Sequence, residues 1–539
     1  MLRKLIFRNF GKTERIFDPA VSAFVDHQVP IKLQNFIDGK WESASKYETV
    51  PNPLTGRDMF HSPCDSSPEA IDRVLASMAK CTKSGLHNPL KNPQLYRTWG
   101  EVFQRAANLL AEPDIEQHFC KLTAAVMPKH TDQILGEVRM VRKYLENFTG
   151  DNPRFALRGF IVPGDSDGQE TVGYRFPYGP VAVIAPFNFP FMLPALHVTG
   201  ALFAGNKALL KPDHRTGIVA EAFVRLLLHC GMPHDSLVLW HNNGANTESL
   251  IKAGSELFRL VQFTGSTKVA DKLSDIMNGK VKIEDSGYNW KILGPDVHNV
   301  EYVAYQCDQD AYAASGQKCS AQRLLVMHEN WVNSEFLKLL KSKAQHRTVK
   351  NLTVGPCLSW TNQKLSEHVN NLLDLPGAKL LWGGHPITEP HTIPSEYGSF
   401  QPTAIFLPLS TINSPLYQDL VFTEVFAPFQ IITQYNDSEL DTVLHMFDKI
   451  HLHLAAGVVS NDVNFIQHVV KNSVNGVTYV GTKGRTTGAP QNHFFGPGND
   501  PRGSGMCSME AIANTWTYHR EVVYDFGSLN GKLNAIKQS

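Results

Sequence analysis

The chain has 539 residues, of which 42% are hydrophobic and 19% are charged, a composition typical of folded domains and long enough for more than one. Lysine plus arginine and aspartate plus glutamate each total 51, so the formal net charge is zero, which argues against nucleic acid or an acidic membrane as the main partner. None of the eight cysteines forms a C-x-x-C pair and no apolar run approaches about 18 residues, so we expect a reducing compartment, no metal site and no membrane span.

The first segment of the chain, residues 1–20, is basic and amphipathic. It has no acid before Glu14, and its apolar residues recur at roughly helical spacing without the long apolar centre of a secretory signal. We therefore predict a mitochondrial targeting segment and a matrix location, the alternative being a solvated basic tail. The basic residues of this segment are Arg3, Lys4, Arg8, Lys12 and Arg15.

Residues 21–157 are expected to form the first part of a cofactor-binding domain. Turn residues separate short strands near 34–43 and 51–57, and a stretch with helical apolar spacing follows. Two short runs then flank the turn-rich PGDSDGQ, which predicts a β-hairpin over 158–176. We expect this hairpin and the tail 506–539 to form an oligomerisation element, so the chain is predicted to be a homo-oligomer.

Strands and helices alternate over 177–293, the second part of the same domain. Alternation at this pace indicates a parallel sheet covered by helices. A second alternating stretch, from about 299 to about 480, predicts a catalytic domain over 294–505. The fold class is therefore α/β, with two parallel-sheet domains of which the first is Rossmann-like. The predicted strands of the first sheet are 181–186, 207–212, 236–241 and 259–266.

Polar or small residues stand where these predicted strands end. Asn188 follows the first strand, Lys211 ends the second and Gly244 follows the third. Gly265 and Ser266 follow the fourth. Because ligands bind at the carboxyl ends of parallel strands, we expect one continuous binding crevice there. The chain has no G-x-G-x-x-G, P-loop, H-E-x-x-H or G-x-S-x-G motif, so a nucleotide would bind in some other way.

A lone cysteine, Cys319, stands in the stretch ASGQKCSAQ from Ala314 to Gln322. Cysteine is the most nucleophilic side chain near neutral pH, but most free cysteines are buried and inert. The stretch alone leaves both interpretations open.

Six motifs, in this order and spacing, carry a resemblance to a known family: PFNFP, LLKP, FTGS, EDSG, GQKCSA and EVFAPF. Together they resemble the aldehyde dehydrogenase superfamily over nearly the whole chain, from FIDGKW onward. Within it, the stretches EDSGYNWKILGPDV and VNGVTYVGTKGRTTGAPQNHFFGPGNDPRGSG resemble the plant-type Δ1-pyrroline-5-carboxylate dehydrogenases. This resemblance implies oxidation of glutamate γ-semialdehyde to glutamate with NAD, in mitochondria and in proline catabolism.

The resemblance assigns catalytic roles to three residues. Cys319 would be the nucleophile, and the Asn188 amide with the Cys319 backbone N–H would hold the oxyanion of the adduct. Glu284 would be the general base that activates water against the thioester. The chain departs from the usual Glu-x-Gly-Gly pattern, because Ser286 replaces a glycine and Asp285 is a second carboxylate that could compete for the role.

The resemblance also assigns a cofactor site and implies NAD. His214 stands where related chains often have a glutamate that disfavours NADP, so this position does not decide between the two coenzymes. Ala427 replaces a glycine of the usual EVFGP, which is tolerable if its φ is negative. The predicted cofactor-binding residues are Pro186, Phe187, Lys211, Gly244, Gly265, Ser266, Glu424 and Phe426.

The substrate implied by the resemblance is small and carries a carboxylate and an ammonium group. Lys318, a compact point charge, suits the carboxylate, and Ser320 flanks the nucleophile on the other side. Gly503 and Ser504 of the PRGSG loop are the predicted anchors of the α-carboxylate. The alternative anchors are Arg485 and Thr487.

Three alternatives remain at this stage. The enzyme could act on another small or acidic semialdehyde, such as succinic semialdehyde. It could be a cysteine hydrolase that pairs Cys319 with His493, although LLKP, FTGS and EVFAPF would then have no role. It could also be a scaffold without activity, which the intact set of Cys319, Glu284 and Asn188 argues against.

Overall fold

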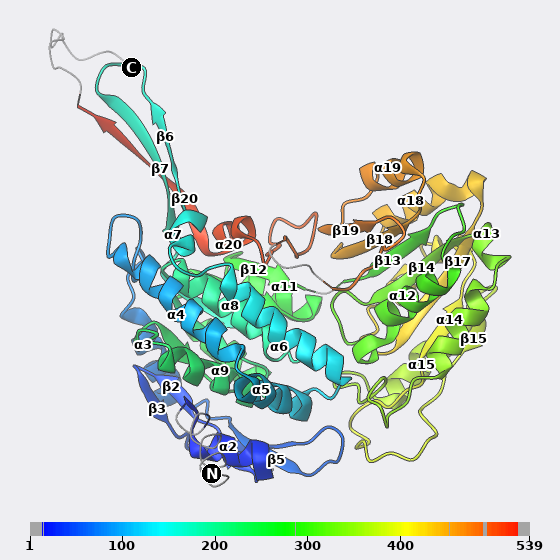
Figure 1. The fold of residues 1–539 in the computed structure, drawn as a ribbon, viewed down its shortest axis with the longest axis horizontal. Coiled ribbons are helices and arrows are strands. Elements are labelled where there is room, and N and C mark those ends of the chain that lie inside the picture. Colours follow the sequence, from blue (N-terminus) through cyan, green and yellow to red (C-terminus); the bar gives the residue numbers. More distant parts are fainter. Residues whose placement is uncertain are drawn as a thin grey trace, which may run out of the picture.

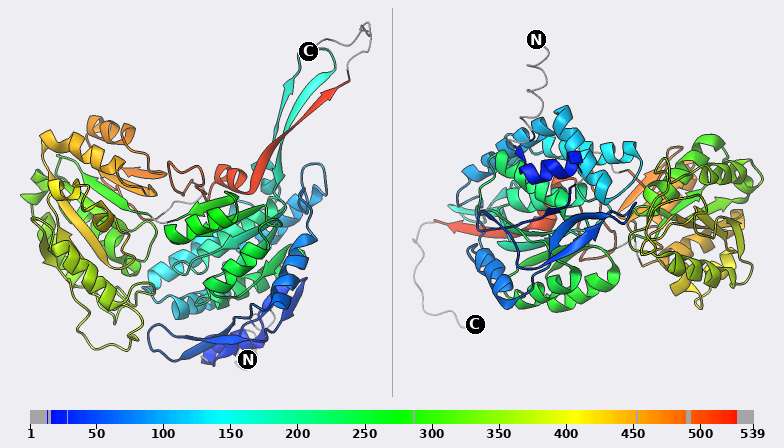
Figure 2. Two further views of the ribbon diagram at one scale, coloured as in Figure 1. Left: turned by 180° about the vertical axis from the view of Figure 1, so that it is seen from behind. Right: turned by 90° about the horizontal axis from the view of Figure 1, so that it is seen from below.

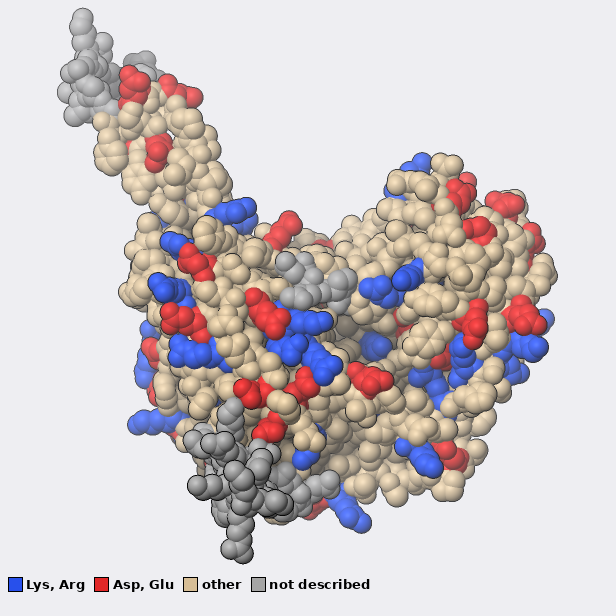
Figure 3. Space-filling view, in the orientation of Figure 1, with Lys and Arg blue, Asp and Glu red and all other residues tan. Residues whose placement is uncertain are grey.

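The computed structural model describes residues 13, 16–27, 29–285, 287–451, 453–488 and 493–526. Most of the predicted targeting segment 1–20 lies outside the described residues, as does the tail beyond 526. No described helix is long and apolar enough to cross a membrane. Two large α/β parts lie side by side, and an arm projects from the first of them (Figure 1). One face is hollowed between the two parts and carries acidic and basic side chains in a mixed pattern (Figure 3).

The first part, which we call the cofactor domain, contains a seven-stranded sheet of order β12-β11-β8-β9-β10-β2-β3. Strands β8 to β12 are parallel, whereas β2 and β3 form an antiparallel edge. Every residue of β8, β9, β10 and β11 is buried, which explains their continuous apolar runs and confirms the four predicted strands. The bounds are β2 (Asn35–Ile37), β3 (Lys40–Glu42), β8 (Pro180–Ile184), β9 (Lys207–Lys211), β10 (Leu237–Leu239), β11 (Leu260–Thr264) and β12 (Val281–Glu284).

Helices pack around this sheet, and a small three-stranded sheet of order β1-β5-β4 lies near the start of the chain (Figure 2). The small sheet consists of β1 (Ile31–Lys32), β4 (Tyr47–Pro51) and β5 (Asp58–Pro63). The helices are α2 (Pro19–His27), α3 (Pro68–Ala79), α4 (Gln94–Leu110), α5 (Pro113–Val126), α6 (Thr131–Glu146), α7 (Asn152–Ala156), α8 (Met192–Phe203), α9 (Gly217–His229), α10 (Gly244–Ala253) and α11 (Thr267–Ile276).

The second part, the catalytic domain, contains a seven-stranded sheet of order β15-β16-β17-β14-β13-β18-β19, parallel except for β15. Its strands are β13 (Asn289–Leu293), β14 (Gln322–His328), β15 (Lys379–Trp382), β16 (Thr403–Phe406), β17 (Phe429–Tyr435), β18 (Ala455–Val459) and β19 (Val477–Val480). Its helices are α12 (Val300–Tyr312), η1 (Ala313–Gly316), α13 (Glu329–Val332), α14 (Phe336–Gln345), α15 (Asn362–Leu373), α16 (Leu409–Ile412), α17 (Gln418–Val421), η2 (Asp437–Glu439), α18 (Leu440–Asp448) and α19 (Val463–Lys471).

The predicted domain boundary at 293/294 is wrong by one strand. β13 pairs in parallel with β14 and β18, so it belongs to the second sheet. The boundary therefore lies between Glu284, at the carboxyl end of β12, and Asn289, at the amino end of β13. An apolar strand buried on both faces carries no signal in its sequence for which of two sheets it joins. The short connection brings the carboxyl end of one sheet to the amino end of the other.

The arm confirms the predicted hairpin and adds a third strand to it. β6 (Phe160–Pro163) and β7 (Gln169–Pro177) form the hairpin, and β20 (Thr517–Asp525) pairs with β7 along its whole length. Helix α20 (Met509–Trp516) attaches the tail to the cofactor domain, where the Asn206 amide donates to the Trp516 carbonyl over 3.0 Å. On the face seen in Figure 3, the arm carries acidic side chains near its tip.

Candidate active site

Cys319 lies in a loop of unusual backbone conformation just before β14. Ala314, Ser315 and Gly316 have φ of 55°, 56° and 66°, a left-handed run that costs strain at the two residues with a side chain. A Cβ on Gly316 would lie 2.1 Å from the carbonyl oxygen of Ala427, so only glycine fits there. Ala427 itself has no positive φ, which confirms that it can replace the usual glycine.

The buried amide of Asn289 ties this loop to the start of the catalytic sheet. Its Nδ2 donates to the carbonyls of Cys319 at 2.7 Å and Ala321 at 2.9 Å, and also approaches that of Gly287 at 3.2 Å. Its Oδ1 accepts from the Ala455 amide on β18 at 2.9 Å. The sequence analysis did not single out Asn289. The available signal was an amide residue opening a largely apolar strand, which demands buried partners.

Asn188 reaches the nucleophile loop from the cofactor domain. Its Nδ2 donates to the Gln317 carbonyl at 3.2 Å, and because an amide carries two hydrogens, a second remains for an oxyanion. The side chain is 3% exposed and lines the cavity beside Cys319. The structure thus brings Asn188 and Cys319 together.

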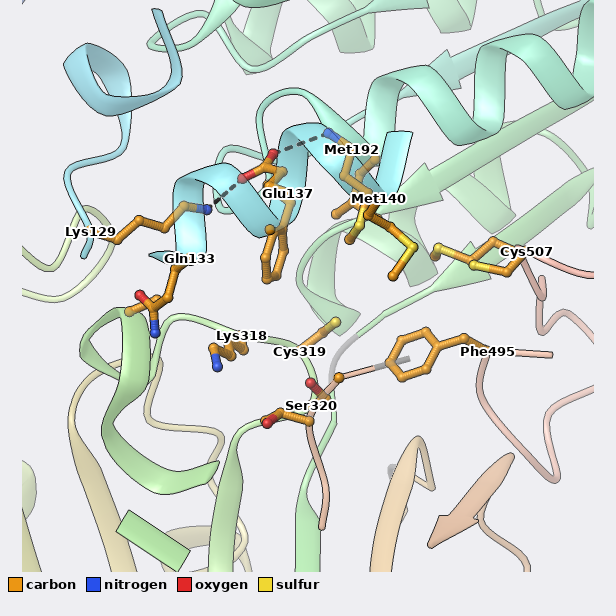
Figure 4. Close-up of a pocket in the computed structure, with 17 residues that line it drawn as sticks. Lys129, Gln133, Glu137, Met140, Met192, Lys318, Cys319, Ser320, Phe495 and Cys507 are labelled. Atoms are coloured by element: carbon orange, nitrogen blue, oxygen red, sulfur yellow. Dashed lines mark hydrogen bonds and ion pairs between the residues drawn. The ribbon is translucent and has the colours of Figure 1, made fainter. Parts of the chain in front are cut away.

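A buried ion pair fixes the loop that carries Asn188, and the sequence analysis missed it. Lys129 Nζ lies 2.6 Å from Glu137 on α6 and donates to the Asn188 carbonyl at 3.2 Å. The second Glu137 oxygen accepts the amides of Phe191 at 2.9 Å and Met192 at 3.1 Å, at the start of α8 (Figure 4). Both charges are thereby matched, as buried charges must be.

Cys319 stands between two cavities. The first, of about 220 Å³, is lined by Lys318 and Ser320 from the same loop, and Figure 4 shows the Cys319 sulfur directed into it. The second, of about 320 Å³, is lined by Asn188 and Glu284. A reacting group in the first cavity and a cofactor in the second would therefore meet at one sulfur atom.

Glu284 is 1% exposed at the carboxyl end of β12. Neither of its oxygens has a standard hydrogen bond from the described residues, and the Cys319 thiol is the group that interacts with it most. Burial, reinforced by the charges of Asp285 and Glu424, raises the pKa of Glu284 to about 7. A carboxyl group with this pKa exchanges protons readily at neutral pH, as a general base must.

Asp285, the rival base, lies elsewhere. It lines neither cavity, and the side-chain charges that act on it most are those of Asp500 and Arg502. Ser286 lies outside the described residues. The glycine after it is explained by a close approach, because a Cβ on Gly287 would lie 2.3 Å from the Cys319 carbonyl oxygen.

The second cavity lies at the point where the order of the cofactor sheet reverses, between β8 and β11. The Phe187 and Phe426 rings meet edge to face with centroids 5.9 Å apart, and Glu424 Oε1 accepts the Gly287 amide at 3.1 Å. Lys211 ends β9 and Gly244 begins α10, but neither lines this cavity. The predicted cofactor residues that line it are Pro186, Phe187, Gly265, Ser266, Glu424 and Phe426.

These residues fit a nicotinamide dinucleotide. Aromatic rings suit a planar ring system, and a carboxylate such as Glu424 suits ribose hydroxyls. Ser266 precedes helix α11, and a helix N-terminus favours phosphate through its amides and dipole. When bound, such a coenzyme supplies the acceptor for the hydrogen and electron pair that leave an aldehyde carbon.

Gly503 and Ser504, the predicted substrate anchors, lie at the edge of the cofactor sheet. Gly503 bridges Ile283 on β12, and the Ser504 amide donates to the Ile283 carbonyl at 2.9 Å, so PRGSG extends the edge of the cofactor sheet. Neither residue lines the first cavity. Of the alternatives, Thr487 lines it, whereas Arg485 lies over the Tyr479 ring at 4.6 Å.

Comparisons with known proteins agree with this site. The aldehyde dehydrogenase family model matches residues 41–519, so the chain belongs to that family, whose members oxidise aldehydes with a nicotinamide cofactor.

Individual relatives narrow the similarity. A mitochondrial Δ1-pyrroline-5-carboxylate dehydrogenase of Arabidopsis thaliana is 46% identical over 92% of this chain and 89% of its own. A probable aldehyde dehydrogenase of Linum usitatissimum is 47% identical over 93% and 90%. An NAD-dependent aldehyde dehydrogenase structure from Sinorhizobium meliloti shares the fold with a TM-score of 0.80 at 17% identity, covering 96% of this chain and 98% of that one.

Replacing Asn289 by alanine should weaken both the fold and the reaction. The carbonyls of Cys319 and Ala321 would lose their buried donor, at a cost of about 2–4 kcal/mol in unfolding free energy. The value of kcat should fall at least about tenfold, because the nucleophile is displaced. Denaturant melts and steady-state rates measure both effects. Asn475→Ala is the control. It removes a 3.3 Å bond to the carbonyl of Ala455, the β18 residue that Asn289 also contacts, and should leave kcat unchanged.

Glu284→Gln should lower kcat by about 10²–10⁴-fold. In the unchanged enzyme, thioester hydrolysis should accelerate as pH rises through about 7, because below that value the carboxyl group is protonated and cannot accept a proton. The variant should lose this dependence, and the burst of reduced cofactor in its first turnover should also slow, because the neutral Cys319 thiol then lacks its proton acceptor. Asp285→Asn should keep the dependence, and its loss in that variant instead would assign the base to Asp285.

Proposed function

We propose that the chain oxidises L-glutamate γ-semialdehyde, the open form of Δ1-pyrroline-5-carboxylate, to L-glutamate with NAD. The observation that carries the proposal is the position of Cys319 between a cofactor-sized cavity and a cavity with a basic side chain. The similarity to the Arabidopsis thaliana enzyme over most of both chains supports the choice of substrate.

The reaction would begin with addition of the Cys319 sulfur to the aldehyde carbon. Burial and the Glu284 carboxylate raise the pKa of the Cys319 thiol well above its usual value, so the thiol is neutral in the resting state. Glu284, with a pKa of about 7, can take the thiol proton as the sulfur–carbon bond forms. The Asn188 amide and the Cys319 backbone N–H would hold the oxyanion of the resulting thiohemiacetal.

Oxidation of this adduct leaves a thioester on Cys319. Glu284 would release the thiol proton to solvent and then accept a proton from a water molecule whose oxygen adds to the thioester carbonyl. The sulfur leaves as a thiolate, which takes up a proton, and the product is the carboxylic acid. One carboxylate thus serves two proton transfers. Glu284 is only 1% exposed, so the thioester beside it is shielded from bulk water and reacts with the water molecule that Glu284 orients.

The charges of the first cavity suit an amino-acid semialdehyde. Burial lowers the pKa of Lys318 to about 8, so its ammonium group persists at neutral pH. No ion-pair partner for Lys318 is present among the described side chains, which leaves its charge for the substrate carboxylate. A carboxylate ligand would offset the free-energy cost of burying that ammonium group.

NAD is the proposed coenzyme, and the state of Arg215 supports it over NADP. This guanidinium stands four residues after Lys211, where a ribose is expected, and would otherwise be a natural ligand for a 2′-phosphate. Its Nε and Nη2 donate to Asp213 at 2.9 and 2.8 Å, and its Nη1 donates to the Leu358 carbonyl at 2.7 Å. The group is therefore already engaged.

A mitochondrial matrix location is part of the proposal. The basic amphipathic segment 1–20 and the mitochondrial relative support it. The hydrolase alternative lacks support, because His493 lies 3.4 Å from the Tyr479 hydroxyl and lines neither cavity beside Cys319.

The proposal is tested by following NADH formation with glutamate γ-semialdehyde as substrate. Two parallel assays replace NAD by NADP, and glutamate γ-semialdehyde by succinic semialdehyde. The semialdehyde and NAD should give the highest kcat/KM. Cys319→Ser should abolish the reaction, because a hydroxyl is a much poorer nucleophile, and Cys64→Ser, which changes another partly exposed cysteine, should not. A higher kcat/KM with succinic semialdehyde, or hydrolysis without any cofactor, would overturn the proposal.

We further propose that the arm packs against a second copy of the chain. β6 is an edge strand with Phe160, Ile161 and Val162 exposed by 47%, 66% and 46%, and exposed apolar edges require a partner. Ile161→Asp should therefore shift sedimentation toward monomers. Val463→Asp changes an equally exposed residue, at 66%, on α19 and should not. Identical sedimentation of both variants and the unchanged chain would contradict the arm's role.

A further inference from the structure

The catalytic domain contains a second buried ion pair, which neither the motifs nor the proposed mechanism uses. Lys291 on β13 and Asp310 on α12 are both 0% exposed, and Lys291 Nζ lies 2.7 Å from Asp310 Oδ2. Burying two charges costs several kcal/mol per ion before pairing, so a network of this kind needs further hydrogen bonds to be tolerated. Asp310 has three besides the lysine.

These bonds connect the core of the domain to the wall of the substrate cavity. Asp310 Oδ2 accepts the backbone amide of Thr486 at 2.8 Å, and Oδ1 accepts the Thr487 hydroxyl at 2.7 Å. The remaining bond to Oδ1 comes from Gln306 Nε2 at 2.8 Å, one helical turn before Asp310. Thr487 lines the cavity that contains the Cys319 sulfur, whereas Asp310 does not. One carboxylate therefore fixes both the backbone and the side chain of this loop segment.

The contact with Asp310 also sets what Thr487 offers to a ligand. A hydroxyl has one hydrogen, and Thr487 donates it to Asp310, so its oxygen can offer only lone pairs to anything else. An acceptor oxygen suits an ammonium group and does not suit a carboxylate. Lys318, in the same cavity, is a donor only and has the opposite preference.

We propose that Asp310 is a positioning residue that holds Thr487 as a hydrogen-bond acceptor for the α-ammonium group of the substrate, while Lys318 receives the α-carboxylate. The inference rests on the proposed function, because it assigns the two charges of the semialdehyde to two sides of one cavity. Lys291 pairs with Asp310 in the interior of the domain, and the two Asp310 oxygens accept the bonds from Thr486 and Thr487.

A comparison of two aldehydes of equal chain length distinguishes this positioning role from a general loss of stability. Glutamate γ-semialdehyde carries the ammonium group, and glutaric semialdehyde lacks it but keeps the carboxylate and the chain length. Thr487→Val should lower kcat/KM for the amino substrate by about 10–100-fold relative to glutaric semialdehyde, mainly through KM, because one charge-assisted hydrogen bond is lost. Thr487→Ser keeps the hydroxyl and should restore the preference.

Asp310→Asn should reduce the same preference, and Asp308→Asn is its matched control. Asp308 lies on the same helix in another buried ion pair, with Arg347 at 2.6 Å, but does not contact the loop. The Asp308→Asn substitution should lower thermal stability without changing the ratio of kcat/KM between the two substrates. An equal loss for both substrates in the Thr487→Val and Asp310→Asn variants, or an altered ratio in Asp308→Asn, would overturn the inference. The unchanged enzyme's rate with glutamate γ-semialdehyde tests the proposed function separately.

Discussion

The active site depends on one buried amide, that of Asn289, at the place where the chain passes from one sheet to the other. Its hydrogen bonds hold the Cys319 loop, the start of β13 and the start of β18 in one arrangement. Only four residues separate it from Glu284 at the end of β12. The loop of the proposed nucleophile is tied to Asn289, and the proposed base Glu284 ends β12, so both are fixed to the ends of two neighbouring strands of different sheets.

Two buried ion pairs extend this arrangement outward. Lys129 and Glu137 hold the loop of Asn188 on the cofactor side, and Lys291 and Asp310 hold Thr487 on the catalytic side. In each pair the carboxylate accepts backbone amides as well as the lysine. Such pairs contribute little net stability because desolvation offsets their attraction, but they allow very few alternative loop positions. In this enzyme the two ion pairs fix the positions of the loops that carry Asn188 and Thr487.

The sequence supported correct predictions where a pattern has a single physical meaning. A short continuous apolar run such as 181–185, bounded by turn residues, favours a buried strand, and β8 lies there. The motifs around Asn188 and Glu284 converge because both stand at the carboxyl ends of strands of the cofactor sheet, and Cys319 joins them from the loop before β14. The sheet that β13 joins and the position of the PRGSG loop were not predictable, because both depend on which strand pairs with which, and pairing partners leave no local signal.

The sequence by itself determined the α/β class, the strands of the cofactor sheet and the chemistry available at Cys319, because these follow from local periodicity and side-chain type. Only the tertiary structure decided how that chemistry is arranged. It raised the pKa of Glu284 by burying it, removed Asp285 from the site, and placed Thr487 rather than Ser504 in the substrate cavity. Burial, desolvation and contacts between residues far apart in the chain exist only after the two sheets have met, so no local pattern can encode them.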